Sequence, residues 1–374
     1  MVALYEKIRG DRMVWVIVLL LSVVSILVVY SSTGQLAYKY KEGNTFYYFF
    51  KHFIILFMGL GIIYLTHKIK YSYYSRIAQV LYWISLPLLL LTMIIGVNLN
   101  GASRWVNIFG ISFQPSDLAK LALIMYLARI LSRKQDKIND FKEGFLPIVI
   151  PVLVVCALIL PADFSTTALI FATSLVIMFI GRVNWKFLGI LIGSSIVGLV
   201  MFILIAVQFL PDSRVQTWEN RLENFWEGGD ESNQNYQANL AKSAIANGGT
   251  FGTFFHGENK NALPQAYSDY VYASIIEEIG MVGGLLVLFL YILLFFRSIK
   301  IAIKCKKVFG SLLAVGCSFS LVFQAMSNMA VAVGLFPVTG QPLPLISMGG
   351  TSIWFTSISI GIILSVSRDG EAEA

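Results

Sequence analysis

Long apolar segments separated by short polar ones dominate the pattern of this chain. A helix that crosses a bilayer needs about 20 mostly apolar residues. The sequence therefore predicts ten transmembrane helices, at about residues 13–32, 46–66, 77–98, 116–131, 145–160, 164–181, 187–210, 270–296, 309–334 and 351–367. The fourth and fifth are short and carry polar residues, so we expect neighbouring helices to shield them from lipid. The expected fold is an all-α polytopic membrane protein, with residues 1–374 as a single transmembrane domain.

The distribution of Lys and Arg predicts how these helices are oriented. Of the 28 Lys and Arg residues, 18 fall in loops on the side of the N-terminus and 7 in loops on the opposite side. Cytoplasmic loops carry the excess of positive charge, so we expect both termini in the cytoplasm. The large loop at 211–269, between the seventh and eighth helices, is then external. Long polar loops on one face indicate that function resides there.

The overall composition agrees with a membrane protein. Apolar residues make up 57% of the chain and charged residues 13%, whereas soluble domains are about 45–50% apolar and about 25% charged. The net charge of +7 reflects mostly the topological bias, so we expect no nucleic-acid binding. The three cysteines, Cys156, Cys305 and Cys317, fall outside the expected external loops, so we expect neither a disulfide nor a cysteine metal site.

The external stretch "NGASRWVNIFGISFQPSDLAK" carries two cations, Arg104 and Lys120. Its apolar and aromatic residues favour a re-entrant or surface segment at the membrane interface. Pro115 permits a helix start that Ser116 and Asp117 could cap, and Lys120 lies one turn beyond Asp117. One interpretation is an anchor followed by a capped helix with an internal ion pair. The other is that Arg104 and Lys120 bind an anionic headgroup, because an Arg fork suits a diphosphate.

Two further segments leave similar alternatives open. Asp163 precedes Ser165 and Thr166, which is typical of a helix N-cap, and a place in a functional site is the alternative. The stretch "YQANLAKSAIANGGTFG" predicts a short amphipathic helix that ends at Gly248 and Gly249. That helix could lie on the membrane or form the wall of a substrate groove.

The stretch "SDYVYASIIEEIG" brings three carboxylates to the start of the eighth helix. Asp269 could be an N-cap, but Glu277 and Glu278 lie too deep for capping. Carboxylates are costly near a bilayer unless they are solvated, paired or functional, which favours a functional cluster. With about 3.6 residues per turn, Asp269 and Glu277 would share one face. Glu278 would then point elsewhere, to a partner such as Arg104 or Lys120.

The last external loop, "GLFPVTGQPLPLISMGGTS", contains three prolines and cannot form a continuous helix. Irregular backbone at membrane depth is tolerated only against protein or a water-filled cavity. We therefore expect a structured wall, with Gln341, Ser347 and Thr351 as its hydrogen-bonding groups.

These motifs together resemble the SEDS family, which includes FtsW and RodA. "ASRWVNIFGISFQPSDLAK", "PADFSTTAL", "SDYVYASIIEEIG" and "GLFPVTGQPLPLISMGGTS" correspond, in order, to four signature regions of that family. The resemblance covers nearly the whole chain, and its last motif is highly specific. It implies a peptidoglycan glycosyltransferase that polymerises lipid II on the outer face of the bacterial cytoplasmic membrane. The last motif resembles FtsW more than RodA, which implies septal cell-wall synthesis.

The resemblance also implies roles for individual residues. It makes Asp269 the catalytic carboxylate, as a base or as the holder of a divalent cation, Mg²⁺ or Mn²⁺. Substrate-binding roles are implied for Arg104, Lys120, Gln114, Asp163 and Ser347, and supporting roles for Asp117, Glu277 and Glu278. The chain departs from the family pattern at several positions, such as Gln265 and Asp117, each in place of a Glu, but keeps Asp269, Arg104, Lys120 and Asp163.

The expected partners are lipid II, a class B penicillin-binding protein and other division proteins. Two alternatives to an FtsW-type polymerase remain: an elongation enzyme of the RodA type, and a lipid II flippase. A flippase needs a polar path through both leaflets, and Glu277 and Glu278 keep that alternative open. A scaffold that only activates a partner synthase is a third class.

Overall fold

The computed structural model describes residues 9–40, 43–99, 102–108, 111–209, 218, 233–253 and 266–372. Most of the expected external loop at 211–269, including Gln265, lies outside the described residues. The helices are α2 (Arg12–Ser32), α3 (Gly34–Tyr40), α4 (Thr45–Lys68), α5 (Tyr71–Ile95), α6 (Pro115–Arg133), α7 (Leu146–Ile159), α8 (Phe164–Ile180), α9 (Trp185–Phe209), α11 (Asn233–Gly248), α12 (Val271–Lys304), α13 (Val308–Ala332) and α14 (Gly350–Ala372). The strands are β1 (Val97–Leu99), β2 (Ala102–Ile108) and β3 (Ile111–Phe113), and two short helical turns, Gln135–Lys137 and Phe141–Phe145, precede α7.

All ten predicted transmembrane segments are helices, namely α2, α4 to α9 and α12 to α14. Eight helices are long and apolar enough to cross a membrane, while α8 is apolar but shorter. The exception is α6, which carries four charged side chains and is shielded by its neighbours, as expected. Its Arg129, for example, donates to the hydroxyl of Ser75 at 2.8 Å and to the amide oxygen of Gln79 at 2.9 Å. The fold is that of an all-α polytopic membrane protein, apart from one small sheet.

Around Arg104 the chain forms a small sheet, which was not predicted from the sequence. The place of this segment at the membrane interface stays a prediction. The strands β1, β2 and β3 pair antiparallel in the order β1-β2-β3, with Val106 opposite Phe113. Strands favour β-branched and aromatic residues, and the Asn-Gly dipeptide at 100–101 is a hairpin signal in the sequence. The sheet contacts α14, because Thr351 donates to the carbonyl oxygen of Ser112 at 3.4 Å and the rings of Phe113 and Phe355 meet edge to face.

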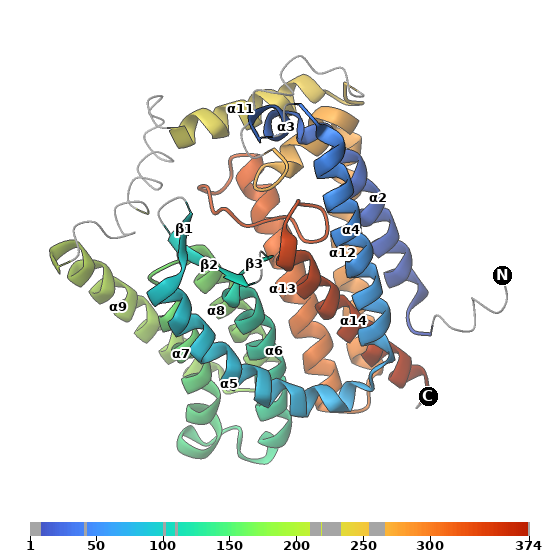
Figure 1. Cartoon of the computed structure of the whole chain (residues 1–374). Helices are drawn as coiled ribbons and strands as arrows, with labels where there is room; N and C mark the ends of the chain where they lie inside the picture. Colours follow the sequence, from blue (N-terminus) through green and yellow to red (C-terminus); the bar gives the residue numbers. More distant parts are fainter. Residues whose placement is uncertain are drawn as a thin grey trace.

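Both ends of the described chain lie at the same end of the bundle (Figure 1). Gly10 lies against the backbone of Leu364 and Arg368. Asp11 caps α2, and its carboxylate accepts a hydrogen bond from Nε of Arg297, on α12, at 3.0 Å. The position of both ends on one side agrees with the expected even number of crossings. The Lys and Arg count predicts that this side is cytoplasmic.

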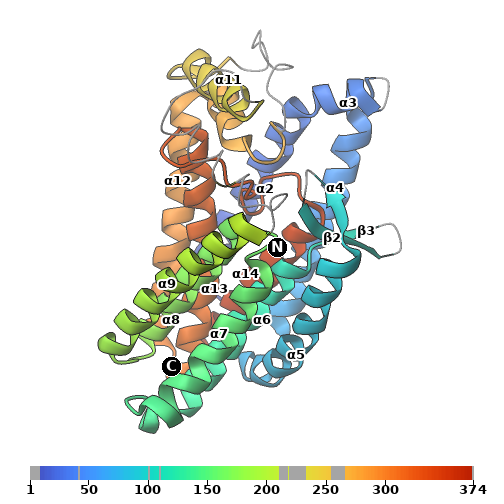
Figure 2. The ribbon, with the colours of Figure 1, turned by 90° about the vertical axis from the view of Figure 1, so that its left-hand side faces the viewer.

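The helices differ strongly in how much of their surface packs inside the protein. Most of α13 and α14 is buried, whereas α9 is almost entirely exposed at the edge of the bundle. Figures 1 and 2 both show α11 at the end opposite the termini, lying across the top of α12. The strands and the loop before α14 lie toward that same end, which is the expected external side.

A break in α12 explains the glycines of the "NGGTFG" stretch. Gly280 has φ +82° inside α12, and its backbone touches the segment after α11. A Cβ on Gly280 would lie 2.3 Å from the carbonyl oxygen of Thr250, and one on Gly252 would lie 2.3 Å from that of Glu278. Met281 N then donates to the carbonyl oxygen of Gly249 at 2.9 Å. The predicted amphipathic helix is confirmed as α11, and it is anchored at the break in α12.

Candidate functional site

Asp269 lies just before α12, at the expected external end. The helix begins at Val271 with Tyr270 at the N-cap position, so Asp269 precedes the cap, and the prediction that it shares a helix face with Glu277 is wrong. Ser268 Oγ donates to the carboxylate of Asp269 at 3.0 Å. The backbone carbonyl of Asp269 accepts from the side-chain amide of Asn328, on α13, at 2.8 Å. The carboxylate is partly exposed, and its backbone is held from α13.

The segment 333–349, here called the proline-rich loop, is the structured wall that the sequence predicted. Ser347 Oγ donates to the carbonyl oxygen of Ser268 at 2.7 Å and accepts from the backbone N–H of Leu343 at 2.8 Å. Met348 N donates to the carbonyl oxygen of Tyr267 at 2.8 Å. Gly340 lies near the carboxylate of Asp269, since a Cβ at Gly340 would lie 3.7 Å from Asp269 Oδ2. The loop thus fixes the residues that lead into Asp269.

Arg104 and Asp163 form an ion pair across the site. Nη1 of Arg104, on β2, lies 2.9 Å from Oδ2 of Asp163, and its Nε donates to the carbonyl oxygen of Ala162 at 3.0 Å. Asp163 also caps α8, where its Oδ1 accepts from the backbone N–H of Thr166 at 3.0 Å. The N-cap interpretation of Asp163 is therefore confirmed, and its second oxygen binds Arg104. A place for Asp163 in a functional site stays a prediction.

Lys120 and Asp117 form the ion pair predicted at the start of α6. Their charged atoms lie 3.5 Å apart, and Lys120 Nζ also donates to the side-chain oxygen of Gln324 at 2.7 Å. The amide nitrogen of Gln324 donates to the carbonyl oxygen of Pro342 at 2.9 Å. The helix cap differs from the prediction, because Gln114 occupies the N-cap position and hydrogen-bonds Ser116 at 3.0 Å.

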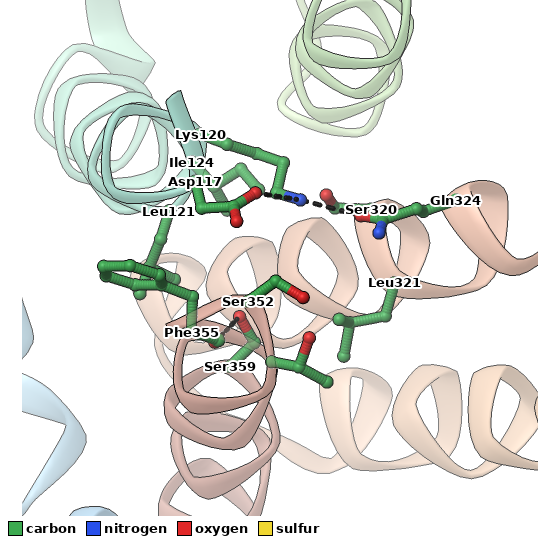
Figure 3. A pocket seen from close by; sticks show the side chains of 11 residues that line it. Asp117, Lys120, Leu121, Ile124, Ser320, Leu321, Gln324, Ser352, Phe355 and Ser359 are labelled. Carbon is green, nitrogen blue, oxygen red and sulfur yellow. Dashed lines mark hydrogen bonds and ion pairs between the residues drawn. The ribbon is translucent and has the colours of Figure 1, made fainter. Parts of the chain in front are cut away.

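A small cavity lies between α6, α13 and α14 at this point (Figure 3). Asp117 and Lys120 face Ser320 and Gln324 across it. Its volume of about 10 Å³ is close to the room that one water molecule needs. The lining is hydroxyl-rich on the α14 side, with Ser352, Thr356 and Ser359.

Hydrogen bonds connect the two ion pairs with Asp269 through the proline-rich loop. Gln341 Nε2 donates to Thr166 Oγ1 at 2.9 Å, beside the Asp163 cap. The backbone oxygen of Gln341 accepts from Asn328 at 2.8 Å, and Asn328 also holds the backbone of Asp269. Arg104, Lys120, Asp163 and Asp269, all singled out in the sequence, thus belong to one connected cluster.

Glu277 and Glu278 lie further along α12 and contact α2 and the segment after α11. Both are buried, and the backbone oxygen of Glu277 accepts from Thr253 N at 2.9 Å. The carboxylate of Glu278 accepts a short hydrogen bond from Ser31 of α2. The suggested partners of Glu278 were wrong, because Arg104 and Lys120 bind other carboxylates.

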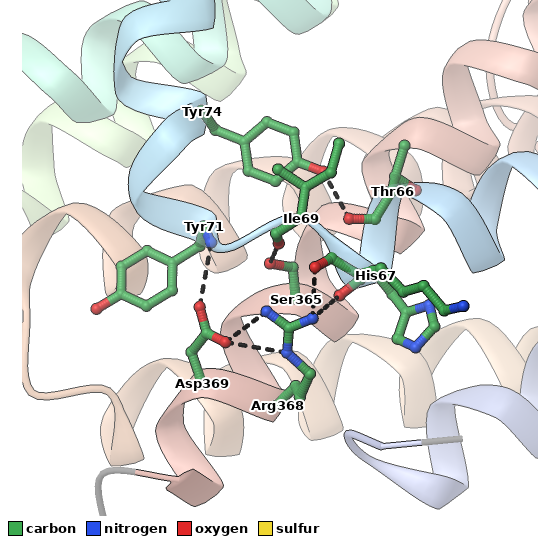
Figure 4. Close-up of polar contacts among 9 residues, drawn as sticks. Thr66, His67, Ile69, Tyr71, Tyr74, Ser365, Arg368 and Asp369 are labelled. Carbon is green, nitrogen blue, oxygen red and sulfur yellow. Dashed lines mark hydrogen bonds and ion pairs between the residues drawn. The ribbon is translucent and has the colours of Figure 1, made fainter. Parts of the chain in front are cut away.

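A second polar cluster lies at the opposite end of the bundle and ties α14 to the turn between α4 and α5 (Figure 4). Arg368 donates to the carbonyl oxygens of His67 at 2.9 Å and Lys68 at 2.7 Å. Asp369 accepts from the backbone N–H of Tyr71 at 3.2 Å. Arg368 and Asp369 pair with each other and with backbone groups of this turn, so this cluster stabilises the fold and does not belong to the candidate site.

Among the residues that the structure describes, Asp269 is the partly exposed carboxylate of this cluster and the candidate metal ligand. Within the described ranges no group of three or more His, Cys, Asp or Glu side chains gathers to bind an ion. Mg²⁺ commonly takes one or two carboxylates together with substrate phosphates. A partly exposed Asp269 is suited to that mode of binding.

Sequence reasoning missed two residues that hold the cluster together, Gln324 and Asn328. They lie four residues apart on α13, so they occupy the same helix face, and both are buried. Amide side chains at this spacing inside an apolar span are an available signal, because buried polar groups in a membrane require partners. Thr166 and Gly340 carried no comparable signal.

Comparison with known proteins identifies the family. The family model described as Cell cycle protein, which covers FtsW, RodA and SpoVE, matches residues 11–372. Stage V sporulation protein E of Bacillus subtilis is 32% identical, covering 97% of this chain and 98% of its own. A probable peptidoglycan glycosyltransferase FtsW of Trichlorobacter lovleyi is 31% identical, covering 96% of this chain and 93% of its own.

Solved structures have the same fold. A chain from a peptidoglycan synthase complex that coordinates polymerization and crosslinking superposes with a TM-score of 0.77 at 26% identity, covering 96% of this chain and 98% of its own. The rod shape determining protein RodA of Thermus thermophilus gives a TM-score of 0.68 at 24% identity, covering 96% and 97%, and supports the fold alone. The chain therefore belongs to the FtsW/RodA/SpoVE family of cell cycle proteins, the SEDS family.

Proposed function

We propose that this chain is a peptidoglycan glycosyltransferase that polymerises lipid II into glycan strands at the outer face of the cytoplasmic membrane. Relatives at about one-third identity carry the name peptidoglycan glycosyltransferase, and family membership supports the same class of reaction here. The observation that carries the proposal is the cluster itself. One partly exposed carboxylate, Asp269, and two cations are joined by the loop that bears the most specific family motif.

The chemistry requires a proton acceptor and a means to stabilise a departing diphosphate. Asp269 would take the proton from the acceptor hydroxyl as that oxygen attacks the anomeric carbon of the donor sugar. The bond from that carbon to the lipid diphosphate breaks, and the diphosphate leaves with the bonding electrons. A diphosphate leaves without prior protonation, so a second carboxylate acting as general acid, as in glycosidases, is unnecessary.

Arg104 and Lys120 retain donors for the diphosphate although both are already paired. Arginine has five N–H donors and lysine three. Two atoms of the Arg104 fork bind Asp163 and Ala162, and Lys120 contacts Asp117 and Gln324. We propose that these carboxylates orient the cations, while the remaining donors contact the phosphate oxygens. Gln114, which hydrogen-bonds the Ser116 hydroxyl, would contact the substrate. Ser347 would complete the site by holding the backbone of Ser268.

Charge balance favours a divalent cation in the loaded site. Asp117, Asp163 and Asp269 outnumber Arg104 and Lys120, so the cluster carries no formal excess of positive charge for a diphosphate. Mg²⁺ or Mn²⁺, held by Asp269 and the diphosphate oxygens, would neutralise the leaving group. The buried Glu277 and Glu278 support α12 and its contact with α2 in this account.

The partner and the cellular location follow from the same relatives. We propose a class B penicillin-binding protein as partner, because a structural relative belongs to a complex that couples polymerization with crosslinking. The exposed apolar faces of the helices provide room for a single transmembrane helix. Relatives named FtsW favour a role at the division septum together with other division proteins. An elongation enzyme of the RodA type is the alternative.

A reconstituted assay separates the polymerase from a flippase and from a scaffold. Purified protein is incubated with lipid II and Mg²⁺ or Mn²⁺, with and without the partner, and the glycan products are resolved by length. Polymer from the wild type, and none from folded Asp269→Ala, is the expected result. Lipid movement across vesicles without polymer would identify a flippase. Polymer that forms equally with wild type and Asp269→Ala, and only when a separate synthase is added, would identify a scaffold.

A further inference from the structure

Two buried side chains of the N-terminal helices reach the proline-rich loop from outside the site. Ser25, on α2, donates its hydroxyl to the carbonyl oxygen of Ile346 at 2.8 Å. His52 Nε2, on α4, lies 2.7 Å from the same hydroxyl. Ser25 is 0% and His52 1% exposed, so neither side chain is available to substrate.

The contact fixes which nitrogen of His52 carries the proton. A serine hydroxyl has one proton, and that of Ser25 is used on Ile346. His52 must therefore be the donor to Ser25, through a protonated Nε2. Its Nδ1 makes no hydrogen bond within the part of the chain that the structure describes. His52 thus donates to Ser25, and Ser25 donates to the loop.

The loop is strained at the residue before this contact. Leu345 has φ +64°, a left-handed conformation that non-glycine residues adopt at an energetic cost and that persists only where the surroundings enforce it. The carbonyls on both sides of Leu345 are held from other helices. Tyr291 of α12 makes a short hydrogen bond to that of Pro344, and Ser25 binds that of Ile346.

The residues after the strained turn hold the backbone that leads to Asp269. Ser347 and Met348 follow Ile346 directly and bind the carbonyls of Ser268 and Tyr267. A rotation of the turn at Leu345 would therefore shift Ser347 and Met348, and with them the backbone that leads into Asp269. Misplacing a reacting group by about 1 Å can cost roughly 100-fold in rate.

We propose that His52 and Ser25 are positioning residues for the polymerase reaction, which act through the strained turn at Leu345 to set the place of Asp269. The inference rests on the proposed polymerase function. It assigns the two N-terminal helices, which contribute no group to the site itself, a role in setting the geometry of that site.

The test uses two pairs of matched variants of the full chain. His52→Gln retains an amide N–H near the position of Nε2, whereas His52→Asn is too short to reach Ser25. Ser25→Ala removes the loop contact, whereas Ser22→Ala removes a buried hydroxyl of the same helix that binds only the helix's own Val18 carbonyl, at 2.7 Å. Polymerisation of lipid II is measured as kcat and KM per folded protein, beside the melting temperature in detergent.

We expect Ser25→Ala and His52→Asn to lower kcat by about 10- to 100-fold, as misplaced reacting groups do, with KM close to the wild-type value. His52→Gln should regain most of the lost kcat, and Ser22→Ala should match the wild type. The inference is overturned if Ser25→Ala and His52→Asn both fail to fold, or if both fold with unchanged kcat. It is also overturned if His52→Gln is as slow as His52→Asn. A wild type that makes no polymer would instead refute the proposed function.

Discussion

The side-chain amide of Asn328 donates to the backbone carbonyl of Asp269 at 2.8 Å, so α13 holds the residue that we place at the centre of the reaction. The same amide nitrogen donates to the carbonyl oxygen of Gln341, also at 2.8 Å. One buried side chain thus joins the start of α12 to the proline-rich loop. The site is assembled around this amide, although Asn328 touches no substrate in our account.

Asn328→Ala should therefore impair both stability and activity. The substitution removes the amide that donates to the carbonyls of Asp269 and Gln341. Each buried carbonyl left without a donor lowers the free energy of unfolding by about 1–3 kcal/mol. We expect a lower melting temperature and a lower kcat for polymerisation per folded protein. Ser327→Ala is the matched control, because that hydroxyl binds only Phe323 of its own helix. Equal effects of the two substitutions would contradict the role of Asn328.

Substitutions of Asp163 should separate its two functions. Asn is as good an N-cap as Asp, so Asp163→Asn should keep α8 capped while it removes the charge that orients Arg104. The expected result is a raised KM for lipid II with a nearly unchanged melting temperature. Asp163→Ala loses the cap as well, which costs a further 0.5–2 kcal/mol, roughly. If Asp163→Asn kept wild-type KM, the ion pair with Arg104 would have no part in substrate binding.

Gly340→Ala should reduce activity through its effect on the backbone beside Asp269. Gly340 has φ +65°, and a Cβ there would lie 3.7 Å from Asp269 Oδ2. A residue with a side chain is strained by about 1–3 kcal/mol in this conformation. The control is Gly350→Ala, where a Cβ would meet open space. Polymerisation rates of the two folded variants check the prediction, and a fully active Gly340→Ala would show that the loop tolerates this change.

Gly252→Ala should destabilise the protein at the break in α12. A Cβ at this position would lie 2.3 Å from the carbonyl oxygen of Glu278, and Gly252 has φ +84°. The backbone must shift, which we expect to cost more than the roughly 1–3 kcal/mol of the strained φ alone. Thermal unfolding in detergent measures the effect, with Gly198→Ala of the exposed α9 as the control. An unchanged melting temperature would mean that α11 is not anchored at the break.

The helices were predictable from the sequence because their apolar segments are long and uninterrupted. Even the polar α6 was found, and so was its ion pair between Asp117 and Lys120, because the spacing of three residues places both on one face. The sheet around Arg104 was missed, since its aromatic residues were interpreted as interfacial anchors. Three short strands leave little periodicity, and the Asn-Gly hairpin signal was overlooked.

The charged members of the candidate cluster could be singled out from the sequence, and so could two polar groups of the proline-rich loop, Gln341 and Ser347. Arg104, Asp163 and Asp269 stand out because charges are costly in this environment. The neutral residues that join them, such as Gln324 and Asn328, depend on which helices pack together. Tertiary packing also decides the position of Asp269 outside α12 and the partner of Glu278, neither of which periodicity within one helix can indicate.

The central claim is that the carboxylate of Asp269 acts in glycan polymerisation. Asp269→Asn tests it most directly, because the amide retains an oxygen that can accept from Ser268 while it loses both charge and basicity. Purified wild type and Asp269→Asn, matched for melting temperature, would be given lipid II and a divalent cation, and glycan polymer would be measured over time. We predict polymer from the wild type and none above background from Asp269→Asn. Polymer at the wild-type rate from Asp269→Asn would contradict the account.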